Sequence, residues 1–352
     1  MKKRIKVLVV DDSALVREIL SQGLGLDPDI EVVGVASDPY MARDKIVRLK
    51  PDVLTLDVEM PRMDGVEFLR RLMPQYPLPV VMVSALTGEG AKTTLEALEA
   101  GAVDYVTKPR SDIARGLSAM LNKLRQKVKI AATANLQEWK DKKFAAAARL
   151  QTVSGAAPAE STGKLIAIGA STGGTRAIRQ LIQSFPVSMP GVVIVQHMPA
   201  GFTRHFADSL NSICEMEVLE AKTNDRVMPG RILIAPGGKH MTVRCSGGVY
   251  LVECKEGEKV NGHCPSVDVL FKSVAGQVGS NAIGLVLTGM GQDGAEGLLA
   301  MRNEGARTIA QDEATSVVFG MPRVAYELGG AESLYPLNSI PQVIMNLLHG
   351  KR

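Results

Sequence analysis

The sequence predicts an α/β protein made of two domains, and three observations support this prediction. Apolar runs with the length of buried strands alternate with helical patterns along most of the chain. A length of 352 residues suits about two domains, and 45% hydrophobic with 22% charged residues is typical of a soluble globular protein. The stretch 154–163 has the composition of a flexible linker. We therefore expect a five-repeat strand–helix domain over 1–122, a linker over 123–160, and a doubly wound, mostly parallel α/β domain over 161–352.

In the first domain, polar side chains follow four apolar runs. The runs over 4–10, 52–56, 79–83 and 104–107 are followed by Asp11 and Asp12, by Asp57, by Ser84 and by Lys108, respectively. Each of these residues could cap a helix, but together they suit phosphoryl transfer to an aspartate at one edge of a parallel sheet. Carboxylates bind Mg²⁺, the ion neutralises the phosphoryl charge, and a hydroxyl and an ammonium contact phosphate oxygens. Asp57, alone after its strand, is the predicted acceptor.

The linker carries the charge imbalance of the chain. Residues 125–160 hold seven basic and three acidic residues, a surplus equal to the formal net charge of +4 for the whole chain. The charges of the two domains therefore sum to zero, which argues against a nucleic-acid-binding surface on either. The part over 135–149 is basic, prone to form a helix, and contains the only tryptophan, Trp139. We expect it either as a solvated spacer or as a helix that docks on a domain or a partner.

The second domain begins with a serine at a strand-to-helix turn. Ser171 lies within 169–174, between an apolar run over 164–169 and a helical pattern over 175–183. In an open α/β fold this position lies at the carboxyl edge of the sheet, where ligands bind, beside helix amides that can stabilise an oxyanion. Ser171 is then either a nucleophile or an ordinary helix N-cap.

A base and an acid are predicted at the same edge. The apolar run over 191–196 ends in His197, and the run over 282–288 leads into a glycine-rich loop that contains Asp293. Sequential strands joined by a helix are commonly neighbours in the sheet. The three side chains would then act as nucleophile, general base, and the carboxylate that orients the imidazole.

Several alternatives remain open at these positions. His240 also follows an apolar run and is a second candidate base, and an aspartate in a glycine-rich loop is often a turn residue. The glycines over 289–294, with Asp312 further on, imitate a dinucleotide-binding fingerprint. The four cysteines form no C-x-x-C pair and are expected as buried thiols of a cytoplasmic protein, with a zinc site that includes His263 as the alternative. No stretch approaches the ~20 apolar residues of a membrane span, so no membrane insertion is expected.

Residues 1–122 resemble the receiver domain of two-component response regulators, which has a flavodoxin-like fold. With Gly-Ala-Ser-Thr-Gly-Gly, Gln-His-Met and Thr-Gly-Met-Gly-Gln-Asp-Gly in the second domain, the whole chain resembles the CheB family of chemotaxis receptor protein-glutamate methylesterases. The resemblance implies these roles in the receiver: metal-binding pair Asp11 and Asp12, phosphorylated Asp57, metal-binding carbonyl of Glu59, switch residues Ser84 and Tyr105, and phosphate-contacting Lys108.

In the second domain the resemblance implies a triad of Ser171, His197 and Asp293, with the Met290 amide as an oxyanion donor. It implies hydrolysis of glutamate methyl esters to glutamate and methanol, deamidation of glutamines, and inhibition by the receiver until Asp57 is phosphorylated. Mg²⁺ would serve phosphorylation, and the esterase reaction would need no cofactor. The implied partners are methyl-accepting chemotaxis receptors as substrate and the histidine kinase CheA as phosphodonor. A non-catalytic binding module switched by phosphorylation is the alternative function.

Overall fold

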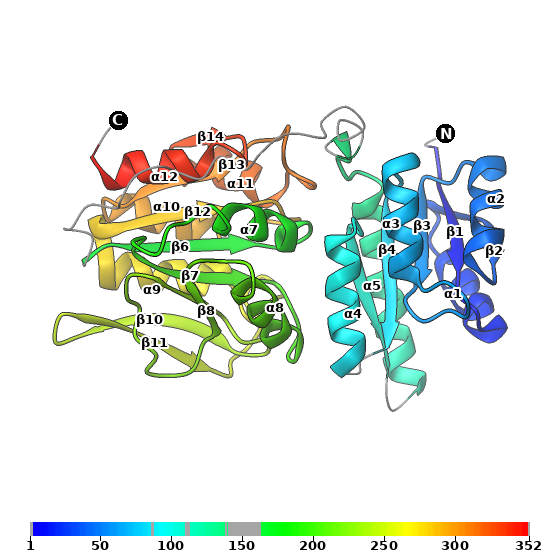
Figure 1. The fold of residues 1–352 in the computed structure, drawn as a ribbon, viewed down its shortest axis with the longest axis horizontal. Helices are drawn as coiled ribbons and strands as arrows, with labels where there is room; N and C mark the ends of the chain where they lie inside the picture. The colour runs from blue at the N-terminus through cyan, green and yellow to red at the C-terminus, as the bar shows by residue number, and fades with distance from the viewer. Residues whose placement is uncertain (1–2, 86–87, 110–112, 138, 140–162, 351–352) are drawn as a thin grey trace. The chain divides into compact units, whose positions relative to one another are not determined.

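The computed structural model describes residues 3–85, 88–109, 113–137, 139 and 163–350. Its contacts divide the chain into two compact units, Met1–Ala147 and Ala148–Arg352, each considered by itself (Figure 1). The stretch 154–163, expected to be flexible, lies outside the described residues apart from Gly163. No described helix is both long enough and apolar enough to cross a membrane.

The first unit is a five-stranded parallel sheet in the order β2-β1-β3-β4-β5. This is the flavodoxin-like order, in which the chain switches direction between β1 and β3. Asp11 and Asp12 follow β1, and Asp57 ends β3, so the three lie at the switch point where such folds bind ligands. The elements are β1 (Ile5–Val10), α1 (Ala14–Gly25), β2 (Ile30–Ala36), α2 (Pro39–Leu49), β3 (Val53–Asp57), α3 (Gly65–Gln75), β4 (Val80–Ala85), α4 (Gly88–Glu99), β5 (Asp104–Lys108) and α5 (Ile113–Ala131).

The first three helices of this unit have N-caps of their own. The side chains of Ser13, Asp38 and Asp64 accept hydrogen bonds from backbone amides in the first turns of α1, α2 and α3. None of these caps is one of the three aspartates at the switch point. A role as helix N-cap, which was possible for each of these aspartates on its own, therefore does not explain Asp11 or Asp57.

The beginning of the expected linker packs on the first unit. Helix α5 extends to Ala131, so residues 123–131 belong to it. Beyond the helix, Leu136 is buried, and the Trp139 indole lies over Gly101, where an added Cβ would be only 2.7 Å from Cζ2 of the indole. Docking on a domain therefore describes this part of the linker better than a solvated spacer, and residues 140–149 lie outside the described part of the chain.

The second unit is built on a seven-stranded sheet in the order β14-β13-β12-β6-β7-β9-β8, with all pairs parallel. A separate antiparallel pair, β10 and β11, accompanies it. The elements are β6 (Leu165–Ala170), α7 (Gly174–Ile182), β7 (Gly191–Gln196), α8 (Phe202–Asn211), β8 (Glu217–Glu220), β9 (Arg231–Ile234), β10 (His240–Ser246), β11 (Val249–Lys255), α9 (Val267–Val278), η2 (Gly279–Asn281), β12 (Ala282–Val286), α10 (Ala295–Asn303), β13 (Arg307–Gln311), α11 (Met321–Glu327), β14 (Ser333–Tyr335) and α12 (Ile340–Leu348).

Both faces of this sheet are covered, as the predicted doubly wound fold requires. Every residue of β6, β7 and β12 is buried, which is typical of parallel strands with helices on both sides. One core cluster joins the sheet to α9, α10 and the β10–β11 pair, whereas α7 and α12 pack against each other and contribute nothing to that cluster. The chain leaves β6 toward β7 and later returns to β12 on its other side, so β6 adjoins the switch point of the sheet.

Candidate active site and phosphorylation site

Ser171 lies in the turn between β6 and α7, at the carboxyl end of the middle strand of the sheet. The N-cap of α7 is Gly173, with φ of 78° and no side-chain hydrogen bond, so the serine hydroxyl is not used as a cap. The Ser171 N–H donates to the Thr288 carbonyl (3.0 Å), and its own carbonyl accepts from Gly174 N–H (2.7 Å) and Gln196 Nε2 (3.0 Å). The bonds with Gln196 and Thr288 attach the turn to the end of β7 and to the segment that follows β12.

The structure brings His197 between Ser171 and Asp293. His197 follows β7, and its Nδ1 lies 3.1 Å from Ser171 Oγ while its Nε2 lies 2.8 Å from Asp293 Oδ2. Because an ionised carboxylate only accepts, we assign the proton to Nε2, which leaves Nδ1 to accept from the serine hydroxyl. The side chains of the histidine and the aspartate are only 7% and 2% exposed. In this arrangement His197, hydrogen-bonded to Asp293, can accept the proton of the Ser171 hydroxyl.

Asp293 accepts five hydrogen bonds. Its donors are His197 Nε2 and Val267 N–H (2.7 Å) at Oδ2, and Ser266 Oγ (2.7 Å), Asn261 Nδ2 (3.1 Å) and Asp268 N–H (3.2 Å) at Oδ1. Burial opposes ionisation of this carboxyl, but the bonds from His197, Asn261 and the Val267 amide hold its pKa well below the usual range. Asp293 is therefore an ionised, fully engaged carboxylate and not a simple turn residue.

Two of these supporting residues, Asn261 and Ser266, were missed by the sequence reasoning. Ser266 is the N-cap of α9, and Asn261 with Gly262 forms a turn with φ values of 53° and 81°. The sequence carries both signals, since Asn-Gly favours such turns and serine favours N-caps. Nothing in a linear sequence says that both would reach the carboxylate of Asp293.

His240, the alternative base, is occupied elsewhere. It is buried at the start of β10, where Nδ1 accepts from Ser266 N–H (3.2 Å) and Nε2 donates to the Glu258 carbonyl (2.7 Å). Both ring nitrogens therefore hold the segment that precedes α9. The geometry favours His197 as the base.

The glycine-rich loop over 289–294 passes close to Ser171 and contains Asp293. A Cβ at Gly289 would lie 2.8 Å from Ser171 Cβ, so only glycine allows the loop to pass this close. Asp312, the acidic residue of the imitated fingerprint, accepts from the amide and hydroxyl of Thr315 in its own turn. The His263 ring stacks on the His197 ring. Among the described residues, the one cluster of three or more side chains that could hold a metal ion is formed by aspartates of the first unit and does not include His263.

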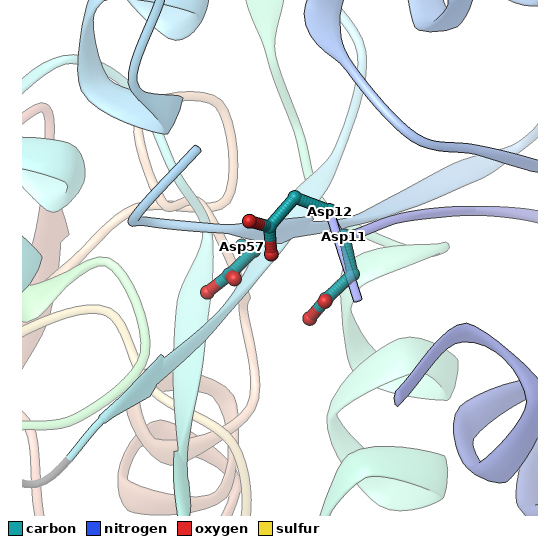
Figure 2. A group of neighbouring side chains, drawn as sticks. All are labelled: Asp11, Asp12 and Asp57. Carbon is teal, nitrogen blue, oxygen red and sulfur yellow. The ribbon is translucent and has the colours of Figure 1, made fainter. Parts of the chain in front are cut away.

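Those aspartates, Asp11, Asp12 and Asp57, converge at the switch point of the first sheet (Figure 2). One oxygen of each lies within 4.8 Å of the others. Lys108 Nζ lies 3.0 Å from Asp11 Oδ2 and 3.0 Å from Asp57 Oδ2. The negative charge of these three carboxylates exceeds the positive charge of the Lys108 ammonium. Carboxylate oxygens are ligands that Mg²⁺ prefers, so the cluster fits this ion.

The electrostatics of this site follow from burial and charge. Burial raises the pKa of Asp57 to about 6 against the opposing charge of Lys108. Burial also opposes protonation of Lys108, yet the carboxylates of Asp57 and Asp11 raise the pKa of its ammonium above the usual value. Position 65 requires glycine next to this site, because a Cβ there would lie only 2.2 Å from the Asp57 carbonyl oxygen.

The remaining residues expected at this site lie around it. Ser84 is buried, and its Oγ accepts from Thr94 Oγ1 of α4 (2.7 Å). Tyr105 is buried beneath Lys127 of α5, whose Nζ lies 5.2 Å from the ring centroid, and burial raises the pKa of the phenol well above its usual value. The exposed Glu59 lines a hollow of about 500 Å³ whose other lining residues are Val58, Met60, Pro61, Asp64 and Thr93.

Comparisons with known proteins match both units. Residues 166–344 match the family model described as CheB methylesterase, and residues 7–121 match that of the response regulator receiver domain. The chain is 68% identical over its whole length, and that of the relative, to a protein-glutamate methylesterase/protein-glutamine glutaminase of Syntrophotalea carbinolica. It is 53% identical to one of Escherichia coli O157:H7, over 97% of this chain and 96% of the relative. The crystal structure of the Thermotoga maritima CheB methylesterase catalytic domain is 38% identical, with a TM-score of 0.52, over 53% of this chain and 99% of that one.

Proposed function

The chain belongs to the CheB methylesterase family, and from this premise we propose that Ser171, His197 and Asp293 form the active site of a protein-glutamate methylesterase and glutaminase regulated by a receiver domain. Its substrates are methyl-ester and amide side chains of chemotaxis receptors. The observation that carries the proposal is the hydrogen-bonded row from Ser171 Oγ through His197 to Asp293 at the switch point of the sheet.

The reaction proceeds through an acyl-enzyme. Ser171 Oγ attacks the ester carbonyl carbon while its proton passes to His197 Nδ1, and the tetrahedral intermediate carries the negative charge on the former carbonyl oxygen. When the intermediate collapses, the carbon–oxygen bond to the methoxy group breaks, and Nδ1–H protonates the leaving group to methanol. Water then attacks the serine ester, giving its proton to Nδ1, and glutamate leaves as Ser171 Oγ regains a proton. With glutamine as substrate the leaving group is ammonia.

Two further groups support these steps. The carboxylate of Asp293 holds Nε2–H and stabilises the imidazolium that forms at each proton transfer. The Met290 N–H, which donates to no acceptor among the described residues, is proposed to donate to the oxyanion together with amides at the start of α7. Nucleophile, base and acid are all side chains, so we propose that the esterase step needs no cofactor.

The receiver is proposed to accept phosphate on Asp57. Asp11, Asp12 and Asp57, with the Glu59 carbonyl, would hold Mg²⁺, which when bound neutralises charge on the incoming phosphoryl group. Lys108 contacts two of these carboxylates and is placed to take a phosphate oxygen, and we assign the switch roles to Ser84 and Tyr105.

The domain borders, partners and compartment follow from the same proposal. Receiver, linker and catalytic domain span 1–122, 123–160 and 161–352, and the receiver inhibits the esterase until it is phosphorylated. The phosphodonor is the histidine kinase CheA, and the protein acts in the cytoplasm.

Methanol release from methylated receptors in membranes tests the proposal. The wild-type chain should release methanol in proportion to the loss of methyl ester, and Ser171→Ala should release none above background. If the wild type binds the receptors but releases no methanol, the non-catalytic binding module becomes the better account.

A further inference from the structure

A second histidine lies face to face with the catalytic base. The rings of His263 and His197 are stacked, with centroids 3.6 Å apart and an angle of 6° between their planes. Both ring nitrogens of His197 are already bonded at its edge, to Ser171 and Asp293. The stack therefore acts on the face of the ring, which those hydrogen bonds do not control.

His263 belongs to the turn whose Asn261 side chain also binds Asp293. Its backbone N–H and carbonyl pair with those of Val260 across the Asn261–Gly262 turn, at 2.9 and 3.0 Å. From that turn Asn261 Nδ2 donates to Asp293 Oδ1 and to Asp268 Oδ2. The turn is thus anchored on the carboxylate that orients the base, and it sets His263 over the same ring.

The need for such a contact changes during the reaction. Before attack, His197 is held at both nitrogens. Once Ser171 is acylated its Oγ has no proton to donate, so the ring keeps only its bond to Asp293 while Nδ1 must orient a water molecule. A ring held at one atom can swing, whereas a ring that is also stacked on a fixed neighbour keeps its plane.

We propose that His263 is a positioning residue for this reaction: its stacked ring holds the imidazole of His197 in the plane that serves Ser171 and, in the acyl-enzyme, the attacking water. The proposal rests on the proposed function of the same site. It assigns no proton transfer to His263 and depends on the aromatic ring alone, so another aromatic side chain should replace it.

The test compares His263→Ala, His263→Phe and a matched control, His349→Ala, a histidine in the exposed C-terminal segment. We expect His263→Ala to lower kcat for methanol release by about two- to tenfold, as the loss of one stacked pair allows, with KM changed less than about twofold. His263→Phe should retain at least half of the wild-type kcat. After acid quenching, mass spectrometry should find more acylated Ser171 in His263→Ala than in the wild type.

The outcomes separate stacking from other roles. An unchanged kcat in His263→Ala, or a His263→Phe enzyme no more active than His263→Ala with both folded like the wild type, would overturn the proposal. If His263→Ala does not fold, His263→Gln takes its place as the non-aromatic variant. Proton NMR of the His197 Nε2–H supplies a readout independent of turnover, since removal of the stacked ring should speed its exchange with water while His263→Phe keeps it slow. Failure of the wild type to release methanol would defeat the proposed function, but this exchange measurement would still test the stack.

Discussion

Replacing Asp293 by asparagine separates the charge of the third triad member from its hydrogen bond. The carboxylate accepts from His197 Nε2 and Val267 N–H at Oδ2, and from three donors at Oδ1. An asparagine has one acceptor oxygen. We expect that oxygen to take the Oδ2 position, because the fixed Val267 N–H lies there at 2.7 Å, whereas the fixed amide at Oδ1, that of Asp268, is more distant at 3.2 Å and the Ser266 hydroxyl can rotate to accept from the new amide.

The size of the effect follows from the geometry. With the oxygen in that position, His197 keeps its proton on Nε2, so the base survives and only the charge of its partner is lost. An imidazolium and a carboxylate with charges ~4 Å apart attract by about 4 kcal/mol at an effective dielectric constant of ~20. Both side chains are nearly buried, so we expect Asp293→Asn to lose about 10²- to 10³-fold in kcat.

The assay is the initial rate of methanol release at saturating methylated receptor, with circular dichroism and thermal melting as checks on folding. Asp312→Asn is the matched control, because among the described residues this carboxylate accepts hydrogen bonds from Thr315 of its own turn, and it should retain wild-type kcat. Retention of more than a tenth of wild-type kcat by Asp293→Asn would show that the carboxylate does not stabilise the imidazolium. A loss as large as that of Ser171→Ala would place the amide nitrogen, and not the oxygen, against His197.

Three further outcomes are expected. Ser171→Ala and His197→Ala should each lose about 10⁶-fold in turnover, as enzymes of this logic do, and a more severe loss in His240→Ala than in His197→Ala would reassign the base. Small phosphodonors should label the chain only with Mg²⁺ present, and Asp57→Asn should remove the label; comparable labelling of that variant would refute the acceptor assignment. The fragment 161–352 should be more active than the unphosphorylated full chain. Phosphorylation should raise the activity of the full chain toward that of the fragment, because every ~1.4 kcal/mol by which it favours the uninhibited state changes the ratio of uninhibited to inhibited molecules tenfold. An equal or lower activity of the fragment would mean that the receiver acts by positive activation or recruitment.

Much of the fold could be predicted because its signals are local. Apolar runs of strand length, each followed by a helical pattern, predicted the parallel sheets of both units. Because consecutive strands joined by a helix are commonly neighbours, the order of the runs also predicted that β6 and β7 pair, and the two strands do pair in parallel. The comparisons bear out the predicted family and fold. The prediction of a solvated spacer was less successful, since Leu136 and Trp139 pack on the first unit. A lone tryptophan in a basic stretch does not reveal that Gly101 leaves room for its ring.

At the candidate active site, the sequence by itself determined which chemical groups end the strands that meet at the sheet edge. Ser171, His197 and Asp293 could be proposed together because parallel strands bring their carboxyl ends to one edge. Both His197 and His240 follow apolar runs, and only the tertiary structure shows that the ring of His197 reaches Ser171 while that of His240 bonds elsewhere. It also decided what holds the triad: the turn at Asn261 lies far from Asp293 in sequence, and its contacts, like the His263 stack, arise from the packing of α9 and its preceding loop against the sheet. Short-range patterns encode turns and caps, but the partner that a turn meets is fixed only when the chain closes on itself.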